Sequence, residues 1–195
     1  MARTLILASS SPYRRALLEQ LRLPFTCVSP HIDEAALPGE RPPELARRLA
    51  QEKVCALAAR HPDALIIGSD QVAECGGRAL GKPGSRERAV AQLQSCSGRA
   101  VHFYTGVSLL DTASGKQRTE VESFAVHFRQ LSDGQIRRYV ELEKPYDCAG
   151  SFKAEGLGVV LFEKMEGSDF SSLIGLPLIR LVELLREFGI DPLTT

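Results

Sequence analysis

Residues 64–71 read Ala-Leu-Ile-Ile-Gly-Ser-Asp-Gln, four apolar residues followed directly by Gly68, Ser69, Asp70 and Gln71. A short, continuous apolar run is typical of a strand that is buried on both faces. Ligands of open α/β sheets bind beyond the carboxyl ends of such strands. We therefore expect Asp70 at the rim of a cleft, held by a rigid strand. The alternative is that Gly-Ser-Asp forms only a turn.

The composition is that of a soluble globular protein. The 195 residues are 44% hydrophobic and 25% charged, which allows a full core in one domain or in a two-lobed domain. The 24 basic and 24 acidic side chains give a net charge of zero. Broad nucleic-acid binding needs a surplus of Lys and Arg, so we expect no nucleic-acid partner.

We expect neither a membrane segment nor a signal peptide. No apolar stretch approaches the ~20 residues that span a bilayer, and Arg14 and Arg15 follow the short apolar N-terminus closely. The five cysteines include no Cys-x-x-Cys pair, and the four histidines lack ligand spacing. This pattern predicts reduced thiols in a cytoplasmic protein, without a disulfide framework or a zinc site.

A serine-rich turn follows the first predicted strand and opens a helix, with Ser11 suited to the N-cap. The N-terminus of a helix offers free N–H groups to an anion. Arg14 and Arg15 place two cations there, against the helix dipole. We interpret this combination, together with Ser9, as an anion site. The alternative is a surface pair in which Arg15 bonds Glu19.

Three further charged residues stand out from their surroundings. Lys53 falls in the apolar stripe of a long helix expected near 42–60, where an ammonium is costly unless it is paired or reaches solvent. Lys82 lies between a flexible glycine and a rigid proline, which favours a ligand contact. Glu34 follows an aspartate on a loop, where carboxylates can hold a hard metal. The alternatives are that the ammonium of Lys53 reaches solvent and that Glu34 is simply solvated.

The order of elements predicts an α/β fold. Helices alternate with strands in the first half, and a long hairpin follows in the middle. Later elements are expected as strands at 101–110, 117–128 and 158–162, a loop at 169–172 and a helix at 177–188. We expect a single domain over 1–195, a two-lobed mixed sheet flanked by helices with a central cleft.

The unusual residues of these segments suit one chemistry. They are Ser9, Ser11, Arg14, Arg15, Glu34, Lys53, Asp70 and Lys82. The cations and the helix N-terminus match a polyphosphate. The carboxylates match either a Mg²⁺-type metal that bridges phosphate oxygens or a base that activates water. We therefore predict metal-dependent hydrolysis of a nucleotide polyphosphate. The sequence contains neither the P-loop motif nor the Rossmann glycine motif, so the site is expected to be of a different kind.

Several short motifs, spread over essentially the whole chain, resemble the Maf family of nucleoside triphosphate pyrophosphatases. They are Leu7-Ala-Ser-Ser-Ser-Pro-Tyr-Arg-Arg15, Asp33-Glu34, Gln51-Glu-Lys53, Ile67-Gly-Ser-Asp-Gln71, Gly81-Lys-Pro83, Ala149-Gly150 and Gly175-Leu-Pro177. The resemblance implies a fold similar to that of inosine triphosphate pyrophosphatases. It also implies hydrolysis of a nucleoside triphosphate to a monophosphate and pyrophosphate, with a divalent metal such as Mg²⁺ or Mn²⁺.

The resemblance also implies roles for individual residues. Asp70 would be the catalytic residue that accepts the proton of the attacking water, or it would act chiefly as a metal ligand. Glu34 would help to hold the metal. The phosphate-binding residues would be Ser9, Arg14, Arg15, Lys53 and Lys82. Homodimers are common among relatives, and by analogy this chain has the same option.

Three positions bear on the substrate. The dTTP/UTP branch of the family typically has Arg, Thr and Gln where this chain has Tyr13, Gln71 and Glu155. These three residues instead resemble the 7-methyl-GTP branch. That branch often has Trp at the position of Tyr13. N7-methylation makes the guanine ring cationic, so Tyr13 can stack on it and Glu155 can compensate its charge. The alternatives are packing of Tyr13 on its own helix and solvation of Glu155. The alternative functions are a dTTP/UTP pyrophosphatase of the same family and a nucleotide-binding regulator of septum formation.

Overall fold

The computed structural model describes residues 3–194, which divide into two compact units. Unit 1 contains the described residues of Met1–Gln71, Thr105–Glu122 and Asp169–Thr195, and unit 2 contains Val72–Tyr104 and Ser123–Ser168. Three long strands contribute to both units, namely β3 (Ala64–Cys75), β5 (Ala100–Asp111) and β6 (Gln117–Phe128). The expectation of a single domain around a cleft stays a prediction.

The strands form one seven-stranded mixed sheet, with β2-β1-β3-β5-β6-β7 as its order and β4 paired to β3. The shorter strands are β1 (Thr4–Leu7), β2 (Thr26–Cys27), β4 (Arg78–Leu80) and β7 (Phe162–Glu166). β1 pairs in parallel with β2 and β3, whereas the pairs β3–β4 and β6–β7 are antiparallel. The predicted α/β class with a mixed sheet is therefore confirmed.

Helices flank the strands in both units. Unit 1 has α1 (Pro12–Glu19), α2 (Pro42–Ala58), α5 (Phe170–Ile174) and α6 (Leu178–Glu187). Unit 2 has α3 (Arg86–Cys96), α4 (Asp133–Glu143) and two short 3-10 helices, η1 (Ala149–Ser151) and η2 (Leu157–Leu161). Within residues 3–194, no helix has both the length and the apolar character needed to cross a bilayer.

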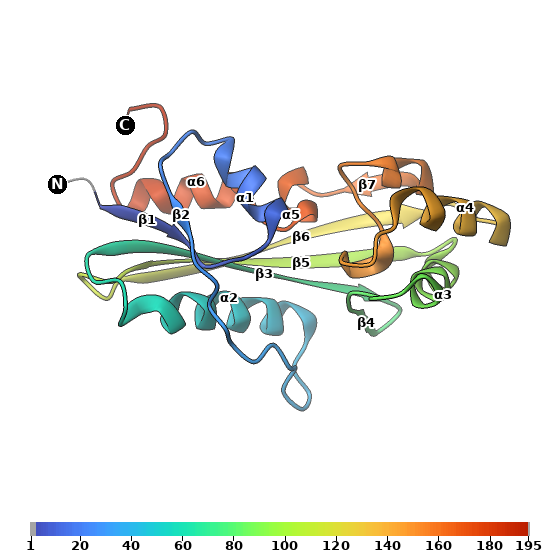
Figure 1. The fold of residues 1–195 in the computed structure, drawn as a ribbon, viewed down its shortest axis with the longest axis horizontal. Helices are drawn as coiled ribbons and strands as arrows, with labels where there is room; N and C mark the ends of the chain where they lie inside the picture. Colours follow the sequence, from blue (N-terminus) through green and yellow to red (C-terminus); the bar gives the residue numbers. More distant parts are fainter. Residues whose placement is uncertain (1–2, 195) are drawn as a thin grey trace. The chain divides into compact units, whose positions relative to one another are not determined.

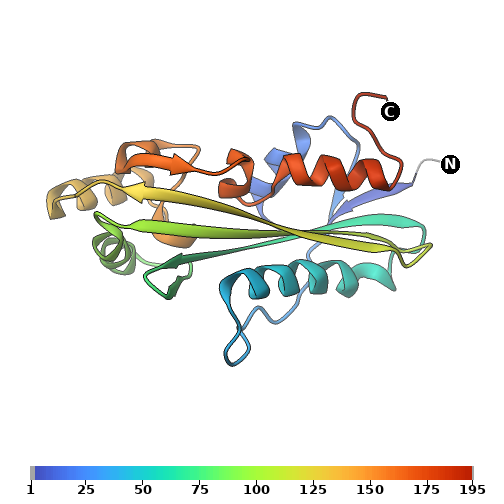
Figure 2. The same cartoon turned by 180° about the vertical axis from the view of Figure 1, so that it is seen from behind.

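In unit 1, α2 covers one face of the sheet, and α1 and α6 cover the other (Figure 1, Figure 2). Leu65 and Ile67 of β3 pack with leucines of α1 and α6, whereas Ile66 packs with apolar residues of α2. Since successive side chains of a strand point to opposite faces, Asp70 belongs to the α2 face and Gln71 to the opposite face.

In unit 2, four phenylalanines form an aromatic cluster. Phe152 contacts Phe103, Phe128 and Phe162 edge to face, with ring centroids 4.9–5.7 Å apart. Such T-shaped pairs stabilise beyond the area that they bury. The cluster therefore fixes the chain between η1 and η2 at Phe152.

The strand that contains residues 64–71 is longer than expected. β3 continues to Cys75, so Asp70 lies within a strand and the alternative of a turn is wrong, whereas its expected position at the rim of a cleft stays a prediction. The strand is longer because Ala73 pairs with Leu80 of β4. The resulting hairpin keeps the residues after Gln71 extended. Asp70 is only 8% exposed.

Two other expected elements differ from the structure. The apolar run predicted as a strand at 158–162 is mostly the 3-10 helix η2, because Gly158 N–H bonds the carbonyl oxygen of Lys153 at 3.1 Å and curls the chain. The loop predicted at 169–172 is mostly α5. Its N-cap is Asp169, whose carboxylate accepts the N–H of Ser171 at 2.8 Å.

Candidate active site

Three charged residues from different elements of unit 1 meet at the α2 face of β3. The ammonium of Lys53 lies 2.5 Å from Asp70 Oδ1 and 2.7 Å from Glu34 Oε1. Lys53 and Asp70 are buried, whereas the side chain of Glu34 is 59% exposed. A buried ammonium is tolerated only with such partners. Lys53, Asp70 and Glu34 therefore lie together, and one cation bridges the two carboxylates.

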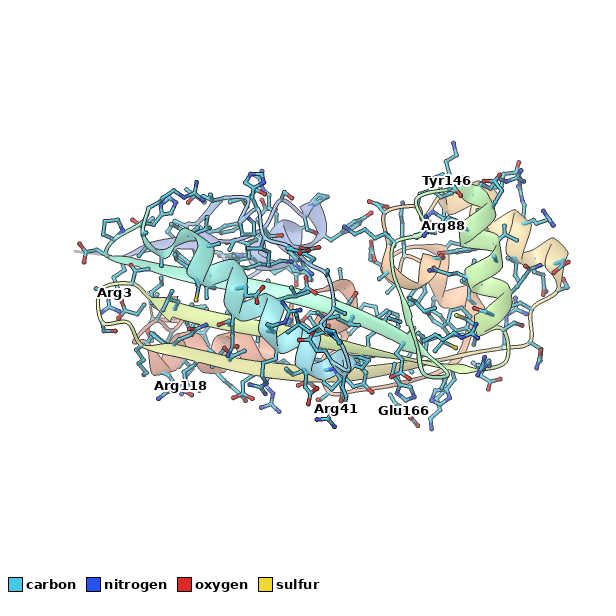
Figure 3. The ribbon with its side chains drawn as sticks, turned by 90° about the horizontal axis from the view of Figure 1, so that it is seen from below. Arg3, Arg41, Arg88, Arg118, Tyr146 and Glu166 are labelled. Atoms are coloured by element: carbon cyan, nitrogen blue, oxygen red, sulfur yellow. The ribbon has the colours of Figure 1, made fainter. Side chains whose placement is uncertain are left out.

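In unit 1, α2 lies across the strands of the sheet (Figure 3). Glycines on two neighbouring strands let it approach them closely. A Cβ atom on Gly68 of β3 would lie 2.4 Å from Ala50 O, and one on Gly106 of β5 would lie 2.3 Å from Ala46 O. Side chains at these positions would clash with the helix backbone. The two glycines thus seat α2 directly on the strands and bring Lys53 to β3.

The loop that carries Glu34 is bound to the same helix. Arg48 of α2 donates from Nε to Glu40 Oε1 at 2.7 Å and from Nη2 to the main-chain oxygen of Ala35 at 2.9 Å. The hydrogen bond from Arg48 lowers the pKa of Glu40 to about 2. Since Ala35 follows Glu34 directly, Arg48 anchors the loop next to the carboxylate that contacts Lys53.

Arg14 of α1 adds a second cation to this group. Its Nε donates to Gly175 O at 2.8 Å, and the hydroxyl of Ser69 lies 2.9 Å from the same oxygen. Burial lowers the pKa of the Arg14 guanidinium, and the charges of Asp70 and Glu34 oppose that shift. Arg14 is therefore within electrostatic reach of both carboxylates.

The N-terminus of α1 is capped as the sequence predicts. The hydroxyl of Ser11 accepts an N–H of the first turn at 3.4 Å, and Ser9 Oγ accepts the N–H of Ser11 at 3.1 Å. Tyr13 is half-buried in that first turn. Arg15 is exposed and donates to Glu19 at 2.9 Å, which is the surface pair considered as the alternative. Arg15 as a phosphate ligand stays a prediction.

Gln71 contacts the main chain of α5. Its Nε2 lies 2.8 Å from Ser172 O and 3.0 Å from Leu173 O. Thr105 of β5 supports the same contact, because its hydroxyl donates to Ser172 O at 2.8 Å. The structure thus ties Gln71 to α5, on the sheet face opposite Asp70, and a role in base recognition stays a prediction.

The other two candidate residues belong to unit 2. Lys82 is exposed between β4 and α3, and Glu155 is exposed between η1 and η2. Their roles in phosphate binding and base recognition stay predictions.

The sequence analysis assigned no role to Ser69, Gly175 or Arg48. Ser69 was detectable, because a fully buried hydroxyl inside an apolar strand needs a hydrogen-bond partner. Gly175 has a φ of +127°, which favours glycine and directs its oxygen to Arg14 and Ser69. The sequence shows the i,i+4 pair of Arg48 with Glu52, but not the contacts of Arg48 with the loop.

The convergence of Asp70 and Glu34 on one ammonium also suits a divalent metal. Mg²⁺ is usually held by one or two carboxylates together with substrate phosphates and water. In the described part of the chain, no group of three or more His, Cys, Asp or Glu side chains could hold a metal ion by itself. The donor set of two carboxylates therefore fits a metal that is shared with a phosphate substrate.

Comparison with known proteins places this chain in a family. Residues 4–188 match the family described as Maf-like protein. The 7-methyl-GTP pyrophosphatase of Pseudomonas aeruginosa is 58% identical over 187 residues, which cover 96% of this chain and 97% of that protein. The protein of the same name from Pseudomonas putida is 58% identical over 186 residues, covering 95% of this chain and 97% of that one. The chain belongs to the Maf-like protein family.

Proposed function

We propose that this protein hydrolyses 7-methyl-GTP to 7-methyl-GMP and pyrophosphate, and so removes a non-standard nucleotide. Near-full-length relatives that are named 7-methyl-GTP pyrophosphatase support this substrate. The observation that carries the chemistry is the contact of Lys53 with Asp70 and Glu34. The cytoplasmic location and the homodimer stay predictions.

In this proposal Asp70 is the general base. The reaction consumes one water and breaks the anhydride bond between the α- and β-phosphates, and Asp70 accepts a proton from the attacking water. Such reactions depend mainly on positioning and on neutralisation of charge. Burial in β3 and the ammonium of Lys53 hold the Asp70 carboxylate in one orientation, which supports this role.

The cations of the site bind the triphosphate. Phosphate oxygens would compete with Asp70 and Glu34 for the ammonium of Lys53, so substrate binding would release carboxylate oxygens. Arg14, which lies within reach of the same carboxylates, would neutralise further phosphate charge. The other phosphate-binding residues of the proposal are Ser9, Arg15 and Lys82.

A divalent metal such as Mg²⁺ or Mn²⁺ belongs to the proposal. Asp70 and Glu34 would hold it together with phosphate oxygens of the substrate. When bound, the metal supplies a Lewis acid that neutralises charge on the phosphates. Asp70 would then serve as metal ligand, as base, or as both.

The base would be recognised through its positive charge. Tyr13 offers an aromatic face for the cationic 7-methylguanine ring. Glu155 offers a carboxylate that can accept hydrogen bonds from the N–H edge of guanine and add a compensating charge. A glutamine at the position of Glu155 would keep one acceptor oxygen but would not supply the charge.

The proposal is tested with purified protein and four substrates. Pyrophosphate and free phosphate are measured with 7-methyl-GTP, GTP, dTTP and UTP, each with Mg²⁺ and with Mn²⁺. We expect pyrophosphate without free phosphate, and the highest kcat/KM with 7-methyl-GTP. A preference for dTTP or UTP would refute the proposal that 7-methyl-GTP is the substrate, but it would agree with the proposed hydrolysis. Binding without turnover of any of the four nucleotides would refute the proposal that the protein is an enzyme.

A further inference from the structure

In unit 2, the last turns of α4 hold both ends of the segment that carries Glu155. The N–H of Leu157 donates to Glu143 Oε1 at 3.1 Å, and the N–H of Lys153 donates to the hydroxyl of Tyr139 at 3.0 Å. The ammonium of Lys153 also donates to Glu143 O at 3.0 Å. Glu155 is the middle residue between these two anchored ends.

The segment itself is a tight turn that leaves room for the Glu143 carboxylate. The N–H groups of Gly156 and Gly158 bond the carbonyl oxygen of Lys153 at 3.3 Å and 3.1 Å. A Cβ atom on Gly156 would lie 3.1 Å from Glu143 Oε2. Glycine at this position therefore lets the carboxylate lie directly against the turn.

The charges around the turn favour its attachment to the end of α4. Tyr139 is buried, and burial raises the pKa of its hydroxyl, with the negative charges of Glu143 and Glu155 acting in the same direction. Tyr139 therefore stays neutral. The ammonium of Lys153 lies at the C-terminus of α4, where the helix dipole favours a cation.

We propose that Glu143 is a positioning residue, which holds the turn around Glu155 so that the Glu155 carboxylate is oriented for the substrate base. The inference rests on the proposed function, in which Glu155 recognises 7-methylguanine. The Glu143 carboxylate accepts the main-chain N–H of Leu157, and its effect on the reaction therefore passes through the turn. A fixed turn has less entropy to lose when the base binds.

The first test compares two alanine variants of α4. Glu143→Ala removes the acceptor for the turn, whereas Glu141→Ala removes an exposed carboxylate that bonds only Arg138 in the same helix. We expect the ratio of kcat/KM for 7-methyl-GTP to kcat/KM for UTP to fall by up to roughly tenfold in Glu143→Ala, because a residue that acts through Glu155 can cost no more selectivity than Glu155→Gln itself. Glu141→Ala should keep the ratio of the wild type.

Two milder variants keep the test valid if Glu143→Ala folds poorly. Glu143→Gln retains an oxygen for the N–H of Leu157 and should keep most of the selectivity. Tyr139→Phe keeps the buried ring but leaves the N–H of Lys153 without its acceptor, and it should lower the ratio. Hydrogen exchange of the peptide around 153–157 should become faster in Tyr139→Phe and Glu143→Ala, and stay unchanged in Glu141→Ala.

A double variant separates positioning of Glu155 from a general effect. If Glu143 acts through Glu155, then Glu143→Ala should not lower the ratio further in a Glu155→Gln background. An equal loss in both backgrounds would overturn the inference, and so would wild-type selectivity in both Glu143→Ala and Tyr139→Phe. A wild-type protein without preference for 7-methyl-GTP would instead refute the proposed function, and the exchange experiment would still report whether Glu143 holds the turn.

Discussion

A Cβ atom on Gly68 would lie 2.4 Å from the main-chain oxygen of Ala50. Gly68 belongs to the strand that carries Asp70, and Ala50 belongs to the helix that carries Lys53. The missing side chain at Gly68 therefore sets the distance between these two elements. It allows an ammonium from the helix to reach a carboxylate of the strand at 2.5 Å.

We expect Gly68→Ala to damage both stability and activity. The added methyl group meets main-chain atoms, which cannot turn away as a flexible side chain can, so α2 has to shift. The free energy of unfolding should fall by about 1–3 kcal/mol, as for other overpacked sites. Because Lys53 moves with α2, kcat/KM should fall as well. Urea unfolding and initial rates measure the two effects.

Gly134→Ala is the matched control. The nearest atom to its added Cβ lies 4.0 Å away, and the position is in a helix, where alanine is favourable. Wild-type stability in Gly68→Ala would show that α2 does not rest on β3 as described.

Replacement of Asp70 by Asn should abolish turnover and keep binding. Asparagine has a similar shape but cannot accept a proton, so kcat should fall about 10²- to 10⁴-fold. The cations that bind phosphate remain, and equilibrium binding of 7-methyl-GTP should persist. Asp63→Asn is a suitable control, since Asp63 is exposed and its φ of +59° is one that Asn adopts readily. Normal turnover by Asp70→Asn would exclude Asp70 as the base.

Gln71→Ala should lower activity with all four nucleotides to a similar extent. The Gln71 amide bonds main-chain oxygens of α5, so its removal weakens the docking of α5 on β3. The free energy of unfolding should fall by roughly 1–3 kcal/mol. Steady-state kinetics with 7-methyl-GTP, GTP, dTTP and UTP are the measurement. A change of preference among these substrates would instead favour a direct role of Gln71 in base recognition.

Glu155→Gln should change the preference among substrates. Glutamine keeps a hydrogen-bond acceptor but removes the negative charge, so kcat/KM for 7-methyl-GTP should fall roughly tenfold more than that for UTP. The exposed position of Glu155 makes a loss of stability small, which a melting curve checks. Equal losses for both nucleotides would contradict recognition of the base by Glu155.

The pair of Arg48 and Glu40 should make stability depend on pH. The pKa of Glu40 is lowered from 4.5 to about 2 in the folded state, so its ionised form stabilises the fold above about pH 4.5. This stabilisation is lost as pH falls from 4.5 towards 2. Glu40→Gln should therefore be less stable than the wild type at pH 7, with a difference that shrinks at pH 3.5. Urea unfolding at both values tests this, and a constant difference would contradict it.

Local physics made much of the fold predictable from the sequence. Ser11 caps α1 as predicted, and Ser132 caps α4 in the same way, because caps depend on residues three apart. The apolar run at 64–67 is a buried strand, as continuous hydrophobicity indicates. The prediction failed at Gly158, where a hydrogen bond from its N–H to the carbonyl oxygen of Lys153 coils the apolar run instead of letting it extend.

Residue types and their spacing indicate which side chains could perform phosphate chemistry, and they mark Lys53 as an ammonium that needs partners. Which partners it has depends on the tertiary fold. Lys53 and Asp70 are 17 residues apart, and Ser69 and Gly175 are 106 apart, so no local period connects them. Their contacts depend on α2 resting on Gly68 and on the alternation of β3, which directs Asp70 to Lys53 and Ser69 to the opposite face. That geometry arises only when the helix and the strand pack together, because the close approach that Gly68 permits is realised only where the two backbones come into contact.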